Sequence, residues 1–186
     1  FMLSAAIPQF VSLLLMRTMF NDNGIINTML INAHVITKGI SFWQSTFWAR
    51  FLVIMINIWV GVPFTMMQVT GVLQNIPSDL YEAAKVDGAG PIRIFFKITL
   101  PLLKPILIYV MITSLIGGLQ MFDVPQILTN GKGDPMRSSM TLIMYLNNHL
   151  YSKNYGMSGA LSVMLFIITG ILSLIVFKFS NGKQDK

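Results

Sequence analysis

Long uncharged apolar runs alternate with polar connections along this chain. A helix needs about 20 residues, rising about 1.5 Å each, to cross a bilayer. Four runs reach or approach that length, at residues 1–20, 51–73, 102–128 and 157–179. Residues 51–73 contain no charge, whereas Asp123 and Pro125 interrupt the third run. The pattern predicts an all-α protein, a polytopic bundle of transmembrane helices.

Three connections separate these runs. Residues 21–50 are mixed and include a short amphipathic piece at 25–36, and residues 74–101 are the most charged part of the chain. Residues 129–156 are polar and contain Asn130-Gly131 and Gly133-Asp134-Pro135, which favour turns. The chain thus divides into spans and connections, with no internal repeat and no low-complexity linker.

Composition agrees with a membrane protein and narrows the chemistry. Of 186 residues, 54% are hydrophobic and 11% are charged, against about 25% charged in soluble domains. The chain has no cysteine, which excludes disulfides and thiolate metal sites, and its two histidines, His34 and His149, are far apart. We therefore expect no metal site and no cofactor bound by this chain.

The net charge of +6 favours membrane loops over nucleic acid. No basic cluster is interleaved with aromatic residues, as nucleic-acid binding would need. If the spans alternate, seven basic residues flank residues 74–101 or follow the last span, and six lie on the other side. Since cytoplasmic loops are enriched in Lys and Arg, the middle connection and the C-terminus are predicted to be cytoplasmic.

The middle connection, residues 77–101, reads as a helix, a turn and a second helix. Asp79 followed by Glu82 fits a capping box, and Gly88 suits the left-handed position that ends a helix. Pro91 can begin a second short helix that runs to Ile98. The small residues and charges suit docking to a partner protein. An amphipathic helix lying on the bilayer surface explains the pattern equally well.

A spacing motif separates these alternatives. Seven positions within residues 82–101 match the EAA motif of ABC importer permeases, and they are Glu82, Ala83, Ala84, Gly88, Ile98, Leu100 and Pro101. The chain therefore resembles that family, in which this segment is the coupling helix that docks on the ATPase. The resemblance implies an ATPase-coupling role for these seven residues and for the adjacent Tyr81 and Asp87.

Wider similarity covers essentially the whole chain. Residues 59–64, 76–77 and 98–101, together with the pairs Phe20-Asn21 and Phe122-Asp123, resemble MalF-like carbohydrate permeases. Such permeases usually have at least six spans, so we expect this sequence to be a C-terminal piece carrying the last four. The resemblance implies four kinds of partner: ABC ATPase subunits, a second permease subunit, an extracytoplasmic solute-binding protein and a sugar. It also implies a prokaryotic cytoplasmic membrane.

Polar groups inside the spans are candidates for the substrate path, because they are costly there without partners. Gln120 and Asp123 offer hydrogen bonds to hydroxyl groups, and Trp59 offers an aromatic face to a sugar ring. The resemblance adds positions that line the sugar site in maltose-type permeases: Gln9, Gly61, Phe64, Gly118 and Met121. Hydrogen bonding between helices remains the alternative role for such polar groups, especially for Asn57 and Gln68.

The chain is expected to be a transporter subunit and not an enzyme. It contains no phosphate loop of the form GxxxxGK[ST], so ATP and Mg²⁺ are expected on the partner ATPase. We expect alternating access to a mono- or oligosaccharide. The alternatives are a permease of the same class for a polyol or glycerol phosphate, and a channel or structural membrane protein of another class.

Overall fold

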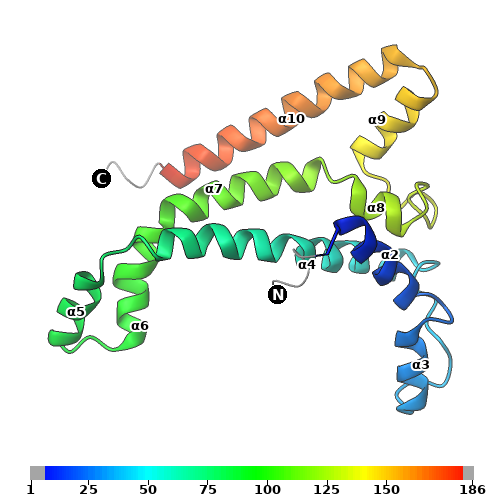
Figure 1. Cartoon of the computed structure of the whole chain (residues 1–186). Helices are drawn as coiled ribbons and strands as arrows, with labels where there is room; N and C mark the ends of the chain where they lie inside the picture. Colours follow the sequence, from blue (N-terminus) through cyan, green and yellow to red (C-terminus); the bar gives the residue numbers. More distant parts are fainter. Residues whose placement is uncertain (1–6, 182–186) are drawn as a thin grey trace. The chain divides into compact units, whose positions relative to one another are not determined.

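The computed structural model describes residues 7–181, and within that range it contains helices and no strand (Figure 1). The elements are α2 (Gln9–Met19), α3 (Ile25–Asn32), α4 (Thr46–Leu73), α5 (Ser78–Val86), α6 (Pro91–Ile94), the π-helix η1 (Phe95–Thr99), α7 (Leu100–Leu119), α8 (Asp123–Leu128), α9 (Leu142–Tyr151) and α10 (Tyr155–Asn181). The predicted all-α fold is confirmed.

Among the described residues, three helical stretches are long and apolar enough to cross a membrane. They are Thr46–Leu73, Pro91–Leu128 and Tyr155–Lys178. They correspond to the second, third and fourth predicted spans. The first predicted span begins outside the described residues, and its described part forms the 11-residue helix α2.

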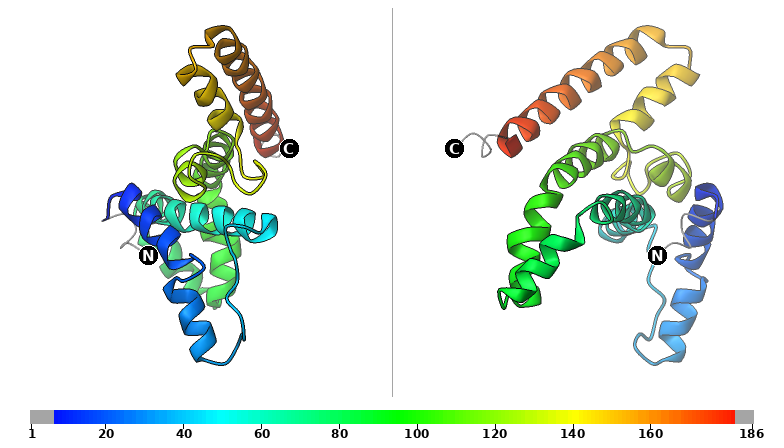
Figure 2. Two further views of the ribbon diagram at one scale, coloured as in Figure 1. Left: turned by 90° about the vertical axis from the view of Figure 1, so that its right-hand side faces the viewer. Right: turned by 60° about the vertical axis from the view of Figure 1, so that its left-hand side comes forward.

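The chain forms two compact units. The first comprises Phe1–Pro63 and Gly117–Gly170, and the second comprises Phe64–Ile116 and Ile171–Lys186. Within the first unit, a buried cluster draws on α2, α4, α8 and the connection before α4. Its members are Leu13, Phe42, Leu52, Val53, Ile56, Val124 and Leu128. Helices α2 and α8 lie side by side in this unit (Figure 2).

The connection between α3 and α4 is held by one buried amide. Asn27 is 1% exposed, and its Nδ2 donates to the Ile40 carbonyl oxygen at 2.9 Å while its Oδ1 accepts from the Ile40 N–H, also at 2.9 Å. Nδ2 also donates to the carbonyl oxygens of Asn21 and Asp22. A buried amide with its donors and acceptor satisfied fixes the path of the surrounding loop.

The third predicted span is broken slightly earlier than its sequence suggested. Pro125 was expected to interrupt it, but Pro125 is a buried residue inside α8. Helix α7 ends at Leu119, and residues 120–122 form the break before α8. Two adjacent glycines, Gly117 and Gly118, precede this break.

Candidate functional site

The predicted coupling segment folds as two antiparallel helical pieces within the second unit (Figure 1). Gly88 has φ +73. The Ala89 N–H donates to the Ala84 carbonyl oxygen at 2.9 Å, and the Gly88 N–H donates to that of Lys85 at 3.0 Å. This is the Schellman pattern that closes a helix C-terminus. The predicted role of Gly88 as the residue after the helix is confirmed.

The predicted capping box is wrong. Helix α5 begins at Ser78 after Pro77, and no side chain caps it. Asp79 therefore lies inside the first turn, where its carboxylate faces the positive end of the helix dipole but does not receive the capping bond. Pro77 is the N-cap residue, so the helix starts two residues earlier than the capping box requires.

The second predicted helix of this segment, to Ile98, is longer and less regular than expected. Helix α6 passes into the π-helix η1 and then directly into α7, which contains Leu100 and Pro101. Pro101 has no N–H, and its ring would crowd the carbonyl of Lys97 in a regular α-helix. A widened π turn over Phe95–Thr99 accommodates that proline, and such turns occur often at functional sites.

One hydrogen bond ties the two pieces together. The hydroxyl groups of Tyr81 on α5 and Thr99 on η1 are 3.3 Å apart, and Thr99 is buried. Ala84 and Asp87 on the first piece and Arg93, Lys97 and Ile98 on the second border a cavity of about 340 Å³. Thr99 was not singled out from the sequence, because a threonine in an apolar run carries no local signal.

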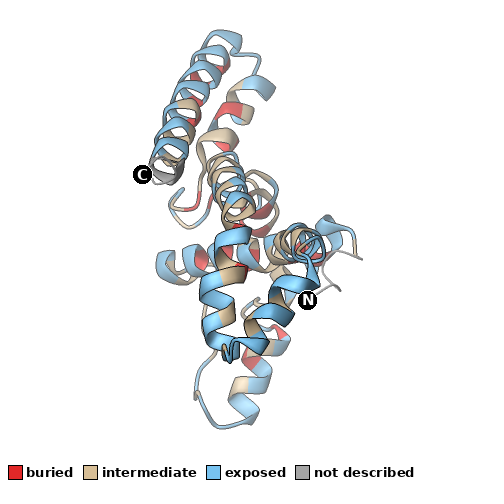
Figure 3. Cartoon of the chain, turned by 90° about the vertical axis from the view of Figure 1, so that its left-hand side faces the viewer, coloured by how far each residue is buried: buried red, intermediate tan, exposed pale blue. Residues whose placement is uncertain are grey.

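The outer surface of the segment is open. Helix α5 contains no buried residue (Figure 3). Five large apolar side chains of the segment are exposed, and they belong to Leu80, Val86, Ile92, Phe95 and Phe96. Glu82 and Ala83 are also exposed. Exposed apolar groups gathered beside charged ones are typical of a protein-docking surface.

The predicted substrate-path residues lie on four helices and a break. Gln9 begins α2, Trp59, Gly61 and Phe64 lie on α4, and Gly118 is near the end of α7. Gln120 and Met121 lie in the break, and Asp123 begins α8.

Their surroundings differ. Gln9, Gly61, Phe64, Gly118, Gln120 and Asp123 are exposed, whereas Trp59 and Met121 are partly buried. Met121 packs against the core cluster, and its carbonyl oxygen accepts a hydrogen bond of 2.8 Å from the Thr141 hydroxyl. None of the eight residues lines the cavity beside α5 or the larger cavity of the first unit. Their shared role as a sugar path stays a prediction.

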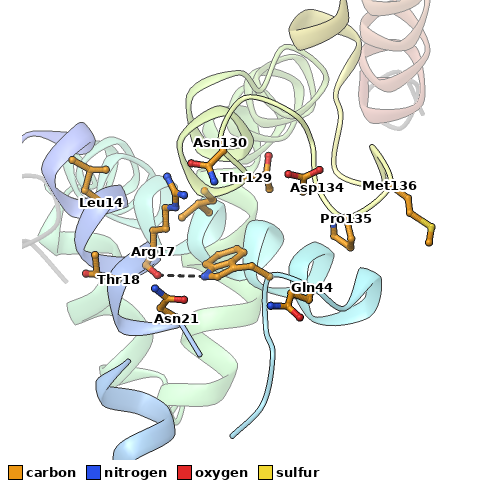
Figure 4. Close-up of a pocket in the computed structure, with 12 residues that line it drawn as sticks. Leu14, Arg17, Thr18, Asn21, Gln44, Thr129, Asn130, Asp134, Pro135 and Met136 are labelled. Carbon is orange, nitrogen blue, oxygen red and sulfur yellow. Dashed lines mark hydrogen bonds between the residues drawn. The ribbon is translucent and has the colours of Figure 1, made fainter. Parts of the chain in front are cut away.

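The larger cavity lies elsewhere in the first unit, and the sequence did not predict it. Its volume is about 670 Å³. It lies among the C-terminal end of α2, the connection before α4 and the turn after α8 (Figure 4). The lining residues are Leu14, Arg17, Thr18, Asn21, Trp43, Gln44, Leu128, Thr129, Asn130, Asp134, Pro135 and Met136.

Hydrogen bonds fix two walls of this cavity. Arg17 Nη1 donates to the Ile127 carbonyl oxygen at 3.3 Å, which satisfies one of the last carbonyls of α8. The Trp43 indole N–H donates to the Arg17 carbonyl oxygen, also at 3.3 Å. In the residues that the structure describes, no group of three or more His, Cys, Asp or Glu side chains could hold a metal ion.

Comparison with known proteins gives a consistent result. The family described as binding-protein-dependent transport system inner membrane component matches residues 1–182. The chain is 36% identical over 191 residues to the maltose/maltodextrin transport system permease protein MalF of Escherichia coli K12, an alignment that covers 97% of this chain and 37% of MalF. It is 32% identical over 173 residues to the lactose transport system permease protein LacF of Rhizobium radiobacter, covering 92% of this chain and 58% of LacF.

A solved structure shares the fold. It is the crystal structure of a bacterial ABC transporter involved in the import of the acidic polysaccharide alginate. The match has a TM-score of 0.79 at 22% sequence identity and covers 92% of this chain and 60% of that chain. The chain thus spans less than two thirds of the length of each of these proteins.

Proposed function

We propose, because this chain belongs to the family of binding-protein-dependent transport system inner membrane components, that it forms part of the permease of an ATP-driven sugar importer. The similarity to maltose/maltodextrin and lactose permease proteins supports a mono- or oligosaccharide as the substrate. The three apolar helical stretches support a multi-pass position in the cytoplasmic membrane of a prokaryote.

The observation that carries this proposal is the exposed α5–α6 segment. Its EAA spacing begins with Glu82, Ala83 and Ala84 on α5, a helix that buries none of its own residues. A surface segment that leaves five large apolar side chains uncovered is typical of a site that binds a protein or a membrane, and the EAA spacing favours a protein. In this family the expected partner is the ATPase, which would hold ATP and Mg²⁺.

The expected mechanism is alternating access. Closure of the ATPase pair would move the docked α5–α6 segment, and the motion would reach the spans through η1 and α7, which continue from it without a break. The Tyr81–Thr99 hydrogen bond would make the two pieces of the segment move as one. A second permease subunit would complete the sugar path beside the exposed residues Gln9, Phe64 and Asp123.

Uptake by the full transporter tests the proposal. The permease subunits, the ATPase and the solute-binding protein are reconstituted in liposomes with internal ATP, and uptake of labelled maltose, maltotriose, lactose and sorbitol is measured. We expect accumulation of at least one saccharide that stops when ATP is omitted. Accumulation of sorbitol alone would reassign the substrate to a polyol. ATP-independent leakage of all four solutes would contradict an importer.

A further inference from the structure

The cavity of about 670 Å³ in the first unit is separate from every predicted substrate-path residue. We propose that it is an accessory site for a neutral saccharide, formed by the C-terminal end of α2 and by the connections before α4 and after α8. This inference rests on the proposed function, because it assumes that saccharides reach this chain. The volume lies within the range of small-molecule sites, roughly 300–1,000 Å³.

The charges in the cavity favour a neutral ligand. Arg17 and Asp134 are the only charged residues that line it, and they carry opposite signs. They form no ion pair with each other or with another described residue, since no salt bridge occurs among the residues that the structure describes. An anionic ligand would gain from Arg17 but would be repelled by Asp134. A polyhydroxylated neutral ligand can donate to the carboxylate and accept from the guanidinium at once.

Several hydrogen-bonding groups in the cavity have spare capacity. A guanidinium carries five N–H donors, and only one hydrogen bond, to Ile127, joins the Arg17 side chain to another described residue. The Asn130 side chain has no hydrogen bond to a described residue, and it reaches the cavity from the turn after α8, opposite Arg17 on α2 (Figure 4). Guanidinium, amide and carboxylate groups arranged around one space match the hydroxyl groups of a sugar ring.

The Trp43 ring offers an apolar surface for a sugar ring. Trp43 lines the cavity, and its indole N–H is already bound to the Arg17 carbonyl oxygen, so its orientation is fixed. A fixed indole presents an apolar face at little entropic cost, and the C–H face of a sugar ring packs on such a surface.

Protection of an engineered thiol tests the site in the full transporter. The chain has no cysteine, so Thr18→Cys places one thiol in the cavity when the other subunits are also made cysteine-free. We expect maltotriose or lactose to slow its reaction with an impermeant methanethiosulfonate about tenfold. Glycine betaine at equal osmolarity should not slow it. A thiol at Thr37, exposed and outside the cavity, should react at the same rate in every condition.

A glycine substitution then links the protection to a named side chain. Asn130 has φ +57, a conformation that glycine adopts freely, so Asn130→Gly removes the amide without straining the turn. The concentration of saccharide that gives half protection should rise roughly threefold to tenfold, as expected for one lost hydrogen bond. Lys153→Gly makes the same kind of change at another positive φ, +59, outside the cavity, and should leave protection unchanged.

The outcomes separate this inference from the proposed function. If the Thr18→Cys transporter imports a saccharide but no saccharide protects the thiol, the accessory site is refuted and the importer stands. If protection occurs without any import, the site stands and the importer function fails. Protection that needs the solute-binding protein and no sugar would show that a protein loop fills the cavity, which also overturns the inference.

Discussion

At the scale of single residues, four helices of this chain end on a left-handed residue. The residue after the C-cap has positive φ in each case, at His34, Gly88, Asn130 and Lys153. The next N–H then bonds back to a carbonyl of the last helical turn, at 3.0 Å for α3, 2.9 Å for α5, 2.7 Å for α8 and 2.9 Å for α9. Glycine fits this position without cost and asparagine tolerates it, whereas His34 and Lys153 adopt it against their preference.

Adding a Cβ at Gly88 and removing the side chain of Lys153 should change the stability of the protein in opposite directions. Gly88→Ala should lower the free energy of unfolding by about 1 kcal/mol, because alanine resists positive φ. A Cβ at Gly88 would meet nothing within 4 Å, so backbone strain is the whole effect within this chain. Lys153→Gly should raise stability by a similar or smaller amount. Thermal unfolding of the purified transporter at one scan rate measures both.

A neighbouring glycine is the matched control for this comparison. Gly90 has ordinary backbone angles, φ −72 and ψ 163, and a Cβ there would also meet nothing within 4 Å. Gly90→Ala should therefore leave the unfolding temperature nearly unchanged. Equal decreases in unfolding temperature from Gly88→Ala and Gly90→Ala would show that the positive φ of Gly88 does not determine the loss of stability.

Only one of these four helix ends could be predicted from the sequence. Gly88 was recognised because glycine is the residue that most often follows a helix in the left-handed conformation. His34 and Lys153 gave no such signal, because residues other than glycine are uncommon at positive φ. Asn130 was correctly predicted to lie in a turn from the Asn130-Gly131 pair, although its place beside a cavity was not foreseen.

At the scale of elements, the local fold of residues 77–101 was predicted well and that of the last connection poorly. Gly88 and Pro91 indicated a helix, a turn and a second helical piece, because each of these features depends on residues close in sequence. Residues 129–156 were expected to be turn-rich, yet they contain α9, which begins at Leu142. Its Thr141 cap accepts the Met144 N–H at 3.3 Å and donates to the Met121 carbonyl oxygen at 2.8 Å. That second bond joins residues 20 positions apart in the sequence, so a local sequence pattern cannot predict it.

The exposed face of α5 leads to a prediction about coupling. Glu82 is exposed, and its side chain forms no ion pair or hydrogen bond with another described residue, so Glu82→Lys should leave the helix intact. If Glu82 meets the ATPase, the change removes a charged contact and adds a repulsion. We expect substrate-stimulated ATP hydrolysis and uptake to fall roughly tenfold to a hundredfold, because contacts to charged groups contribute about 1.5–3 kcal/mol.

The same helix supplies the control. Asp79 lies three residues earlier, outside the EAA spacing, and is also exposed, so Asp79→Lys should keep most of the uptake. Co-purification with the ATPase separates lost docking from lost transmission of movement. Wild-type hydrolysis and uptake in Glu82→Lys would remove this helix from the coupling role and weaken the proposed function.

At the scale of the whole molecule, apolar runs predicted the spans but could not predict what surrounds them. The three long helices match predicted runs, because the length of an apolar run can be read directly from the sequence. The large cavity was missed because its lining combines α2, the connection before α4 and the turn after α8, segments that come together only through folding. The substrate-path residues were found mainly by family resemblance, and most of them are exposed on this chain alone.

The order of the elements predicts on which side of the membrane each connection lies. Lys85 is on α5, before the helical stretch Pro91–Leu128, and Lys153 follows that stretch, just before α10 begins at Tyr155. One crossing therefore separates them along the chain. Both residues are exposed, so a thiol at either position should react from its own side. The basic residues around the first of these connections favour its cytoplasmic location.

Cysteine labelling in intact cells tests this arrangement. In the cysteine-free chain, Lys153→Cys should react with an impermeant maleimide added outside, whereas Lys85→Cys should react only after the membrane is permeabilised. Cysteine has a Cβ as lysine does, so neither change adds backbone strain at the positive φ of Lys153. The reverse pattern would invert the topology and place α5 away from a cytoplasmic ATPase. Labelling of both positions from outside would mean that Pro91–Leu128 does not cross the membrane, because a spanning helix must separate the two connections.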